Sequence, residues 1–349
     1  IYEQQSLSTL ALGDDCVYAF TAEADWSRTY GGYSLCVDLK TGAIHWIQRN
    51  QDAGYYWAGA AHLNGFLLVA GDDGRLCAIA ADSMTGTASG ALDLGAPVRS
   101  TIVNSDDVAY VVTTDGVLHK VTVGSTGQPR ELARVSFADY STSSPAIADG
   151  VIYVGGSKNG QGVLAAIDAA SMKVLGSVSS ANDSPLPGEV KSMPTLVRDS
   201  DGIVALFTCN GAIGEYPDYT GGGGVYAYRL GNTQATLAFD PPMGMHNYSM
   251  GSIAYGLGRF YYVNDSGRLF ALSLADNPRP DDPVPPQESG DKNPHPDIQA
   301  GPASAQDLPP AQTQDVIDDS ETPLTQSAAR SMGTIILTAP TATTTSLEP

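Results

Sequence analysis

The residues best suited to chemistry form two sets that hold equivalent positions in successive segments of the chain. The first set comprises Gln5, Tyr55, Pro97, Tyr140, Glu189 and Tyr248, and the second comprises Leu7, Trp57, Arg99, Thr142, Lys191 and Met250. The candidate ligand-binding residues among them are Tyr55, Trp57, Arg99, Tyr140, Glu189, Lys191 and Tyr248. Aromatic rings beside cations can hold a flat anionic ligand or a sugar. The alternative is that these side chains stack and pair among themselves and close a channel.

Other patterns of catalytic or metal-binding chemistry are weak. The five histidines form no HxH or HExxH motif, so we expect no metal site. The sequence has no GxSxG nucleophile motif, and we predict no catalytic residue. The glycines of 221–224 lack the lysine of a phosphate-binding loop. Stretches such as Asp72-Asp73-Gly74 lack the ligand spacing of a calcium loop and predict hairpin turns.

The unit that positions these residues is clearest between Ser143 and Asp168. Three strand-like runs are separated by Asp149-Gly150 and Asn159-Gly160, pairs that accept the positive φ of hairpin turns. Tyr153 marks the middle run, and its counterparts are Tyr18, Leu68, Tyr110, Ala205 and Tyr261. Their spacing of roughly 40–55 residues is close to the period of four-stranded propeller blades. In the fifth copy, Glu189 and Lys191 fall at the equivalent positions only if residues are inserted before Gly202.

The repeat resembles the PQQ-like repeat of quinoprotein-dehydrogenase-like β-propellers. The family pattern, DGxxYVGxxDGxLxALDxxTGxxxW, is matched best at Asp149–Asp168 and at Tyr33–Trp46. The resemblance covers about residues 4–275 and implies an all-β fold, a β-propeller of four-stranded antiparallel blades. Six repeats are visible, from a first strand at Gln4–Leu10 onward. Because relatives usually have eight blades and sometimes seven, we expect two more blades upstream of this sequence. The alternative is a six-bladed ring closed by residues 1–5 or by Thr334–Leu337.

The resemblance implies the fold more specifically than the function, because the repeat serves dehydrogenases, assembly scaffolds and surface proteins alike. Dehydrogenases of this family stack a quinone on a tryptophan, bind Ca²⁺ through acidic and amide oxygens, and often carry two adjacent cysteines. Here Cys16, Cys36, Cys77 and Cys209 are not adjacent, and no matching calcium cluster can be assigned. We therefore expect no cofactor, with PQQ and calcium belonging only to the dehydrogenase alternative. The sequence leaves open whether Cys16 and Cys36 form a disulfide.

Composition divides the chain into a propeller at residues 1–275 and a proline-rich, acidic tail at residues 276–349. A tail of this kind cannot bury enough apolar surface to order itself, so we expect a disordered spacer. The net charge of −20 disfavours binding to nucleic acid and to anionic membranes. No apolar run reaches the roughly 18 residues of a membrane span, so we expect no transmembrane segment.

These observations predict a non-catalytic platform that binds an extracellular protein, a glycan or a small ligand. Loops at the blade tips would contact a partner through Trp26, Tyr30, Tyr216 and Tyr219. The segment Gly54–Gly59 is similar to propellers of Gram-positive bacteria that are secreted or attached to the wall, so we expect a secreted or cell-surface location. The alternatives are a PQQ- and calcium-dependent dehydrogenase and a scaffold for envelope assembly.

Overall fold

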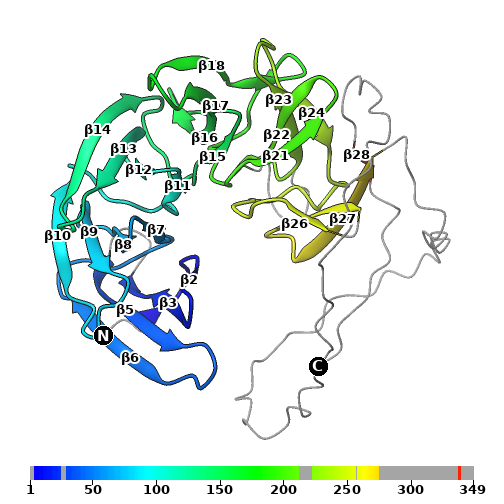
Figure 1. Cartoon of the computed structure of the whole chain (residues 1–349). Coiled ribbons are helices and arrows are strands. Elements are labelled where there is room, and N and C mark those ends of the chain that lie inside the picture. Colours follow the sequence, from blue (N-terminus) through cyan, green and yellow to red (C-terminus); the bar gives the residue numbers. More distant parts are fainter. Residues whose placement is uncertain (1–3, 25–28, 212–221, 257, 275–336, 339–349) are drawn as a thin grey trace, which may run out of the picture.

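The computed structural model describes residues 4–24, 29–211, 222–256, 258–274 and 337–338. These residues form strands and no helix, so none of them supplies a helical membrane span. Figure 1 shows small antiparallel sheets following one another along an arc. Six of these sheets contain four strands in the order expected of a propeller blade, and the sheet of blade one is widened by two more strands. The expected all-β propeller is therefore correct.

The strand bounds follow chain order. Blade one contains β2 (Ala11–Leu12), β3 (Cys16–Phe20), β5 (Thr29–Asp38) and β6 (Ile44–Asn50), widened by β1 (Gln4–Gln5) and β4 (Ala22–Ala24). Blade two contains β7 (Ala61–Leu63), β8 (Phe66–Val69), β9 (Arg75–Ala80) and β10 (Ala88–Asp93). Blade three contains β11 (Val103–Ser105), β12 (Val108–Thr113), β13 (Val117–Val123) and β14 (Pro129–Ser136).

Blade four contains β15 (Ala146–Ala148), β16 (Val151–Lys158), β17 (Gln161–Asp168) and β18 (Val174–Val178). A short hairpin of β19 (Ser180–Ala181) and β20 (Ser184–Pro185) follows it. Blade five contains β21 (Thr195–Asp199), β22 (Gly202–Thr208), β23 (Val225–Arg229) and β24 (Thr236–Phe239). Blade six contains β25 (Ala254–Gly256), β26 (Arg259–Asn264), β27 (Arg268–Leu274) and β28 (Leu337–Thr338).

Hairpin turns use the residue pairs predicted from the sequence. Asp149 and Gly150 join β15 to β16 with φ angles of 51° and 73°. Asn159 and Gly160 join β16 to β17 with φ angles of 51° and 75°. Two consecutive positive φ angles give a turn whose twist matches that of the flanking strands.

The strand marker is confirmed in five blades. Each marker pairs with the first strand of its own blade, as Ala11↔Tyr18, Ala61↔Leu68, Val103↔Tyr110, Ala146↔Tyr153 and Ala254↔Tyr261. In blade five the prediction of Ala205 is wrong by one residue. Leu206 pairs with Thr195 there and packs toward blade six, whereas Ala205 packs toward blade four. The shift arises because the β21–β22 hairpin is longer than the equivalent hairpins of the other blades. Residues added to both of its strands change which residue of β22 pairs with the start of β21, while the local sequence pattern stays the same.

The first strand of blade one also differs from its prediction. It is Ala11–Leu12, and Gln4 and Gln5 instead pair with Glu23 and Ala22 of β4. The predicted segment corresponds to the extended stretch that precedes the first strand in other blades, as Tyr140 precedes β15. Extended residues outside the ladder and strand residues carry the same sequence pattern, so the sequence alone did not separate them.

Blade six obtains its fourth strand from the tail. Leu337 and Thr338 of β28 pair antiparallel with Leu274 and Ser273 of β27, which lies beside it in Figure 1. Pairing from this region was one of the alternatives open from the sequence. Its physical effect is to cover an otherwise open sheet edge. The remaining tail residues lie outside the described ranges, so the spacer stays a prediction.

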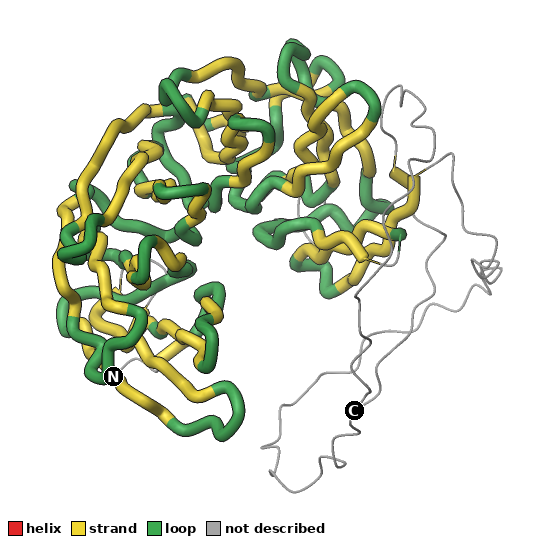
Figure 2. The backbone as a smooth tube through the Cα atoms, in the orientation of Figure 1, coloured by secondary structure: helices red, strands yellow, loops and turns green. Residues whose placement is uncertain are grey.

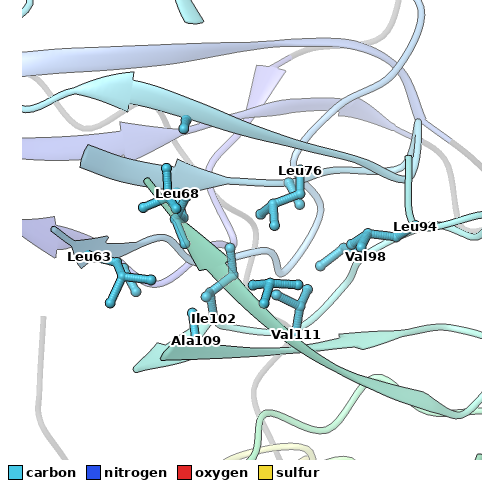
Figure 3. Close-up of a cluster of buried hydrophobic side chains, with 13 residues drawn as sticks. Leu63, Leu68, Leu76, Leu94, Val98, Ile102, Ala109 and Val111 are labelled. Atoms are coloured by element: carbon cyan, nitrogen blue, oxygen red, sulfur yellow. The ribbon is translucent and has the colours of Figure 1, made fainter. Parts of the chain in front are cut away.

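Apolar clusters between neighbouring blades make up the core. Figure 3 shows the cluster in which Leu68 and Leu76 of blade two meet Ile102 and Val111 of blade three. The same arrangement recurs at all five contacts between successive blades: the face that carries the marker packs on the opposite face of the next blade. Burying both faces of a sheet in this way explains why these strands are apolar on both sides.

The arc is open between blade one and blade six (Figures 1 and 2). Both sheet faces at the opening are apolar. Leu12 of blade one is 68% exposed and lies beside Val17 in the register. Leu269 of blade six is 68% exposed, whereas Leu164, at the equivalent position of blade four, is fully buried. A larger ring would cover these faces, and the expected further blades stay a prediction.

The two equivalent leucines test whether burial between blades stabilises the fold. Leu164→Ala should lower the free energy of unfolding by about 2–5 kcal/mol, because the lost methyl groups leave a cavity between blades four and five. Leu269→Ala should lower it by less than about 1 kcal/mol. Urea denaturation followed by circular dichroism measures both values. Equal losses would show that the exposed face of blade six is covered in solution.

Candidate functional site

An extended segment ahead of each first strand is fixed against the second strand of its own blade. The carbonyl of Tyr140 accepts a hydrogen bond from the amide of Ser157 at 2.8 Å, and the carbonyl of Glu189 accepts one from the amide of Asn210 at 2.6 Å. Equivalent bonds join Thr114 to Pro97 and Asp265 to Tyr248. In blade two the bond joins Asp72 to Gly54, so the position predicted for Tyr55 is held by the residue before it. The alignment of Glu189 with Tyr140 is therefore correct, although the marker of that blade was misplaced.

A serine ties several of these segments to the blade a second time. The Ser141 hydroxyl donates to the Gly155 carbonyl at 2.7 Å, and the Ser249 hydroxyl donates to the Val263 carbonyl at 3.2 Å. Ser6 donates to Phe20 in the same way at 3.1 Å. Successive side chains of an extended chain point to opposite sides. A serine that faces the blade therefore directs the next residue toward the axis.

A cavity of ≈ 410 Å³ lies where these inward positions meet. Its lining comprises Leu7, Thr9, Trp57, Arg99, Thr101, Thr142, Ser144, Lys191, Met193, Met250, Gly251 and Ser252. The second set of equivalent positions is thus present in full, with one member from each blade. The volume falls within the range of small-molecule sites, about 300–1,000 Å³.

Three of the seven candidate ligand-binding residues, Trp57, Arg99 and Lys191, line this cavity. Glu189 and Tyr140 lie behind the lining and contact Lys191. The Lys191 ammonium is 3.2 Å from Glu189 Oε2 and 5.8 Å from the centre of the Tyr140 ring. Lys191 also contacts Trp57, and Arg99 joins this group through the ring of Tyr56, so the group spans blades two to five.

The remaining two candidates, Tyr55 and Tyr248, are not part of the lining. The Tyr55 ring lies 5.6 Å from that of Phe20, in the contact between blades one and two. Burial there raises the pKa of Tyr55 to about 12, so its hydroxyl stays protonated. Tyr248 is 48% exposed and lies at the rim position held by Tyr140 in blade four.

The candidate partner-binding loops are only partly described. Trp26, Tyr216 and Tyr219 lie outside the described residues. Tyr30 is a half-buried residue of β5. The proposed partner loops therefore stay a prediction.

Both cations of the cavity are paired with an acid behind them. Arg99 donates from Nε to Asp72 Oδ1 at 2.8 Å and from Nη2 to Asp72 Oδ2 at 2.6 Å. The two side chains are only 12% and 8% exposed, and the hydrogen bonds to Asp72 raise the pKa of Arg99. Lys191 and Glu189 are similarly shielded, at 14% and 12% exposure. The group thus carries two positive and two negative charges.

Sequence reasoning missed Asp72 and Tyr56, which complete this group. Asp72 was assigned only to a hairpin turn, and no local pattern connects it with Arg99 in the next repeat. Tyr56 lies beside Trp57, with ring centres 4.5 Å apart, and the Arg99 guanidinium lies 5.2 Å from the centre of the Tyr56 ring. The recurrence of the inward position was the signal that found Arg99 and Trp57.

Trp57 is held in a strained backbone conformation. Its φ angle is 60°, and it is the one aromatic residue with positive φ among the described residues. A bulky side chain in this region costs roughly 1–3 kcal/mol and persists only where surrounding contacts hold it. The Lys191 ammonium lies 5.3 Å from the centre of the Trp57 ring. Strain of this kind is concentrated at functional sites, which distinguishes this cavity from ordinary gaps between blades.

A hydrogen-bonded set with the residue types of a nucleophile, base and acid occurs in blade three. His119 Nδ1 lies 2.6 Å from Glu131 Oε1, and His119 Nε2 lies 3.1 Å from the Thr113 hydroxyl. Thr113 and His119 are 0% and 1% exposed. A substrate cannot reach a hydroxyl that is buried in a blade, so this set stabilises the sheet.

A larger cavity of ≈ 760 Å³ lies between blades one and two and is lined by Cys16, Cys36 and His62 among others. Burial raises the pKa of Cys36 to about 12, so that thiol is not ionised at neutral pH. Cys36 lies opposite Tyr18 in the register and Cys16 lies opposite Asp38, and both are free thiols. Among the described residues no three His, Cys, Asp or Glu side chains form a metal-binding group. The central cavity, built from all six blades, is therefore the better candidate.

Glycine substitution can measure the strain at Trp57. Trp57→Gly and Trp57→Ala both remove the indole, but only glycine adopts a φ of 60° without strain. Trp57→Gly should therefore unfold with a free energy about 1 kcal/mol higher than Trp57→Ala. Paired urea denaturation curves provide the comparison. A less stable glycine variant would mean that Trp57 does not adopt this conformation in solution.

Comparison with known proteins agrees with this architecture. Residues 31–277 match the family model described as outer membrane protein assembly factor BamB. A similar solved structure is BamB from Moraxella catarrhalis, at 15% identity and a TM-score of 0.47, covering 76% of this chain and 84% of that one. A search of curated proteins found no match. Because the family model spans well over half of the sequence, the chain belongs to the PQQ-like β-propeller family represented by BamB.

Proposed function

We propose that this chain is a non-catalytic binding platform of the bacterial envelope, secreted or displayed at the cell surface. The central cavity is its site for a small ligand, and the blade-tip loops are its surface for a larger partner. The observation that carries the proposal is the strained Trp57 at a cavity in which both cations are already neutralised. The described lining offers an indole, paired cations and hydroxyl groups, which support recognition of a ligand.

The dehydrogenase alternative needs acidic and amide oxygens for Ca²⁺ beside the quinone. The described lining of the cavity contributes Arg99 and Lys191 as its charged groups and contains no carboxylate. Asp72 and Glu189 are engaged with those cations. Calcium would have to compete with both ion pairs, which favours the binding function over the enzymatic one.

A scaffold for envelope assembly is the second candidate. The matching family is named for a protein that acts as an outer membrane protein assembly factor. A scaffold needs protein partners, and loops at the blade tips are surfaces that can contact them. This role and ligand binding at the cavity are compatible, because they use different surfaces.

A thermal-shift screen tests the binding function. The full chain is mixed with sugars, carboxylates, phosphates, amino acids and quinones, and at least one class should raise its melting temperature. A ligand at 100 times its Kd stabilises by about 2.7 kcal/mol, which corresponds to roughly 5 °C or more. The rise should be absent in Trp57→Ala and retained in Tyr255→Ala, an aromatic control that is 65% exposed outside the cavity lining.

Two results would contradict the proposal. One is the absence of any class whose effect depends on Trp57. The other is reduction of a redox dye by the chain after addition of PQQ, Ca²⁺ and an alcohol, with loss of turnover in Arg99→Ala. That result would identify the central cavity as a quinone site and favour the dehydrogenase alternative.

A further inference from the structure

The charge balance of the central cavity limits which ligands it can attract. Arg99 donates two hydrogen bonds to Asp72, and Lys191 is paired with Glu189 at 3.2 Å. An anion that bound to Arg99 or Lys191 would also lie close to the paired carboxylate of Asp72 or Glu189. Repulsion from that carboxylate cancels much of the attraction to the cation. The cavity therefore favours a ligand without formal charge.

Hydroxyl groups supply much of the remaining polar lining, and the protein orients them. The Ser144 Oγ accepts a hydrogen bond from the Thr101 amide at 2.8 Å, and the Ser252 Oγ accepts one from the Met193 amide at 3.1 Å. A hydroxyl that accepts one bond still has its own hydrogen to donate. The Thr101 hydroxyl, which donates to Thr9 at 3.0 Å, adds another acceptor. These groups match a ligand that carries several hydroxyls of its own.

Apolar groups complete the lining. Trp57 forms the aromatic part of the wall, and its strained backbone keeps the indole there at a cost in free energy. Leu7, Met193 and Met250 border the same space and are 48%, 37% and 45% exposed. Sugar rings present C–H groups on their faces and hydroxyls at their edges. They can therefore contact an indole and methionine side chains while their edges bond to serine and threonine.

We propose that the central cavity binds a neutral carbohydrate of one or two rings. The inference rests on the proposed function and specifies the ligand class of the same site. The volume of ≈ 410 Å³ sets the size of the ligand. Trp57 provides the apolar contact, and the hydroxyls of Ser144 and Ser252 provide directed hydrogen bonds. The ion pairs serve to hold Arg99 and Lys191 in place and to remove their net charge.

Isothermal titration of the full chain tests the ligand class. The probes are D-glucose, N-acetyl-D-glucosamine and maltose as neutral sugars, with sodium phosphate and sodium citrate as anions. At least one sugar should bind, and its affinity should change less than about threefold between 50 and 500 mM salt, because no net charge is involved. Trp57→Ala should weaken binding at least tenfold, and the control Tyr255→Ala should leave it unchanged.

Glu189→Gln provides a second test, because it should change the affinity of only one of the two ligand classes. It frees the Lys191 ammonium while preserving the shape of the side chain. Phosphate affinity should rise at least tenfold, and sugar affinity should stay within about threefold of the unmodified chain. Asp72→Asn makes the equivalent change at Arg99, which keeps the test available if one variant is unstable. Stronger sugar binding with unchanged phosphate binding would contradict the proposal.

Failure of the ligand class is distinguishable from failure of the proposed function. If phosphate or citrate binds more tightly than every sugar, with an affinity that falls with salt and depends on Trp57, the carbohydrate assignment is overturned and the binding site stands. The same holds if only another class from the thermal screen binds. If no ligand of any class depends on Trp57, both the site and its ligand class are rejected.

Discussion

Burial of sheet faces between successive blades is the interaction on which the rest of the structure depends. At every contact the marker face of one blade meets the opposite face of the next, and buried apolar side chains from both blades form a cluster there. Neither face of an interior blade is left in water, which is why Ile152 and Leu164, on opposite faces of blade four, are both fully buried. The blades therefore do not behave as independent sheets, because each one sets the position of its neighbour.

This stacking also creates the central site. Each blade brings one extended segment to the axis, and hydrogen bonds such as that from Ser157 to Tyr140 fix the segment to its own second strand. A single inward position per blade is enough to surround a cavity once the blades are arranged along an arc. Side chains then decide the character of the cavity. Trp57, Arg99 and Lys191 come from blades two, three and five, and Leu7 and Met250 come from the blades beside the opening.

The chemistry of the site follows from pairing across blades. Arg99 belongs to blade three and Asp72 to blade two, and their bonds hold both residues at the axis. Lys191 lies over Trp57 of the second blade and is paired with Glu189 of its own segment. Such a network orders the cavity before any ligand arrives and neutralises it at the same time. A preorganised, uncharged cavity is suited to recognition, which is the physical basis of the function proposed above.

The sequence by itself determined the repeat, the blade and the inward positions, because hairpin turns and strand runs are local patterns that recur at a regular spacing. It located Trp57, Arg99 and Lys191 without any knowledge of contacts. It misplaced the marker of blade five at Ala205, since residues added to both strands of a hairpin leave the local pattern intact. Only the tertiary structure decided that Asp72 neutralises Arg99, that Tyr55 turns into the core and that Trp57 has a positive φ. These features depend on how one blade is placed against another, and no periodicity within a single repeat contains that information.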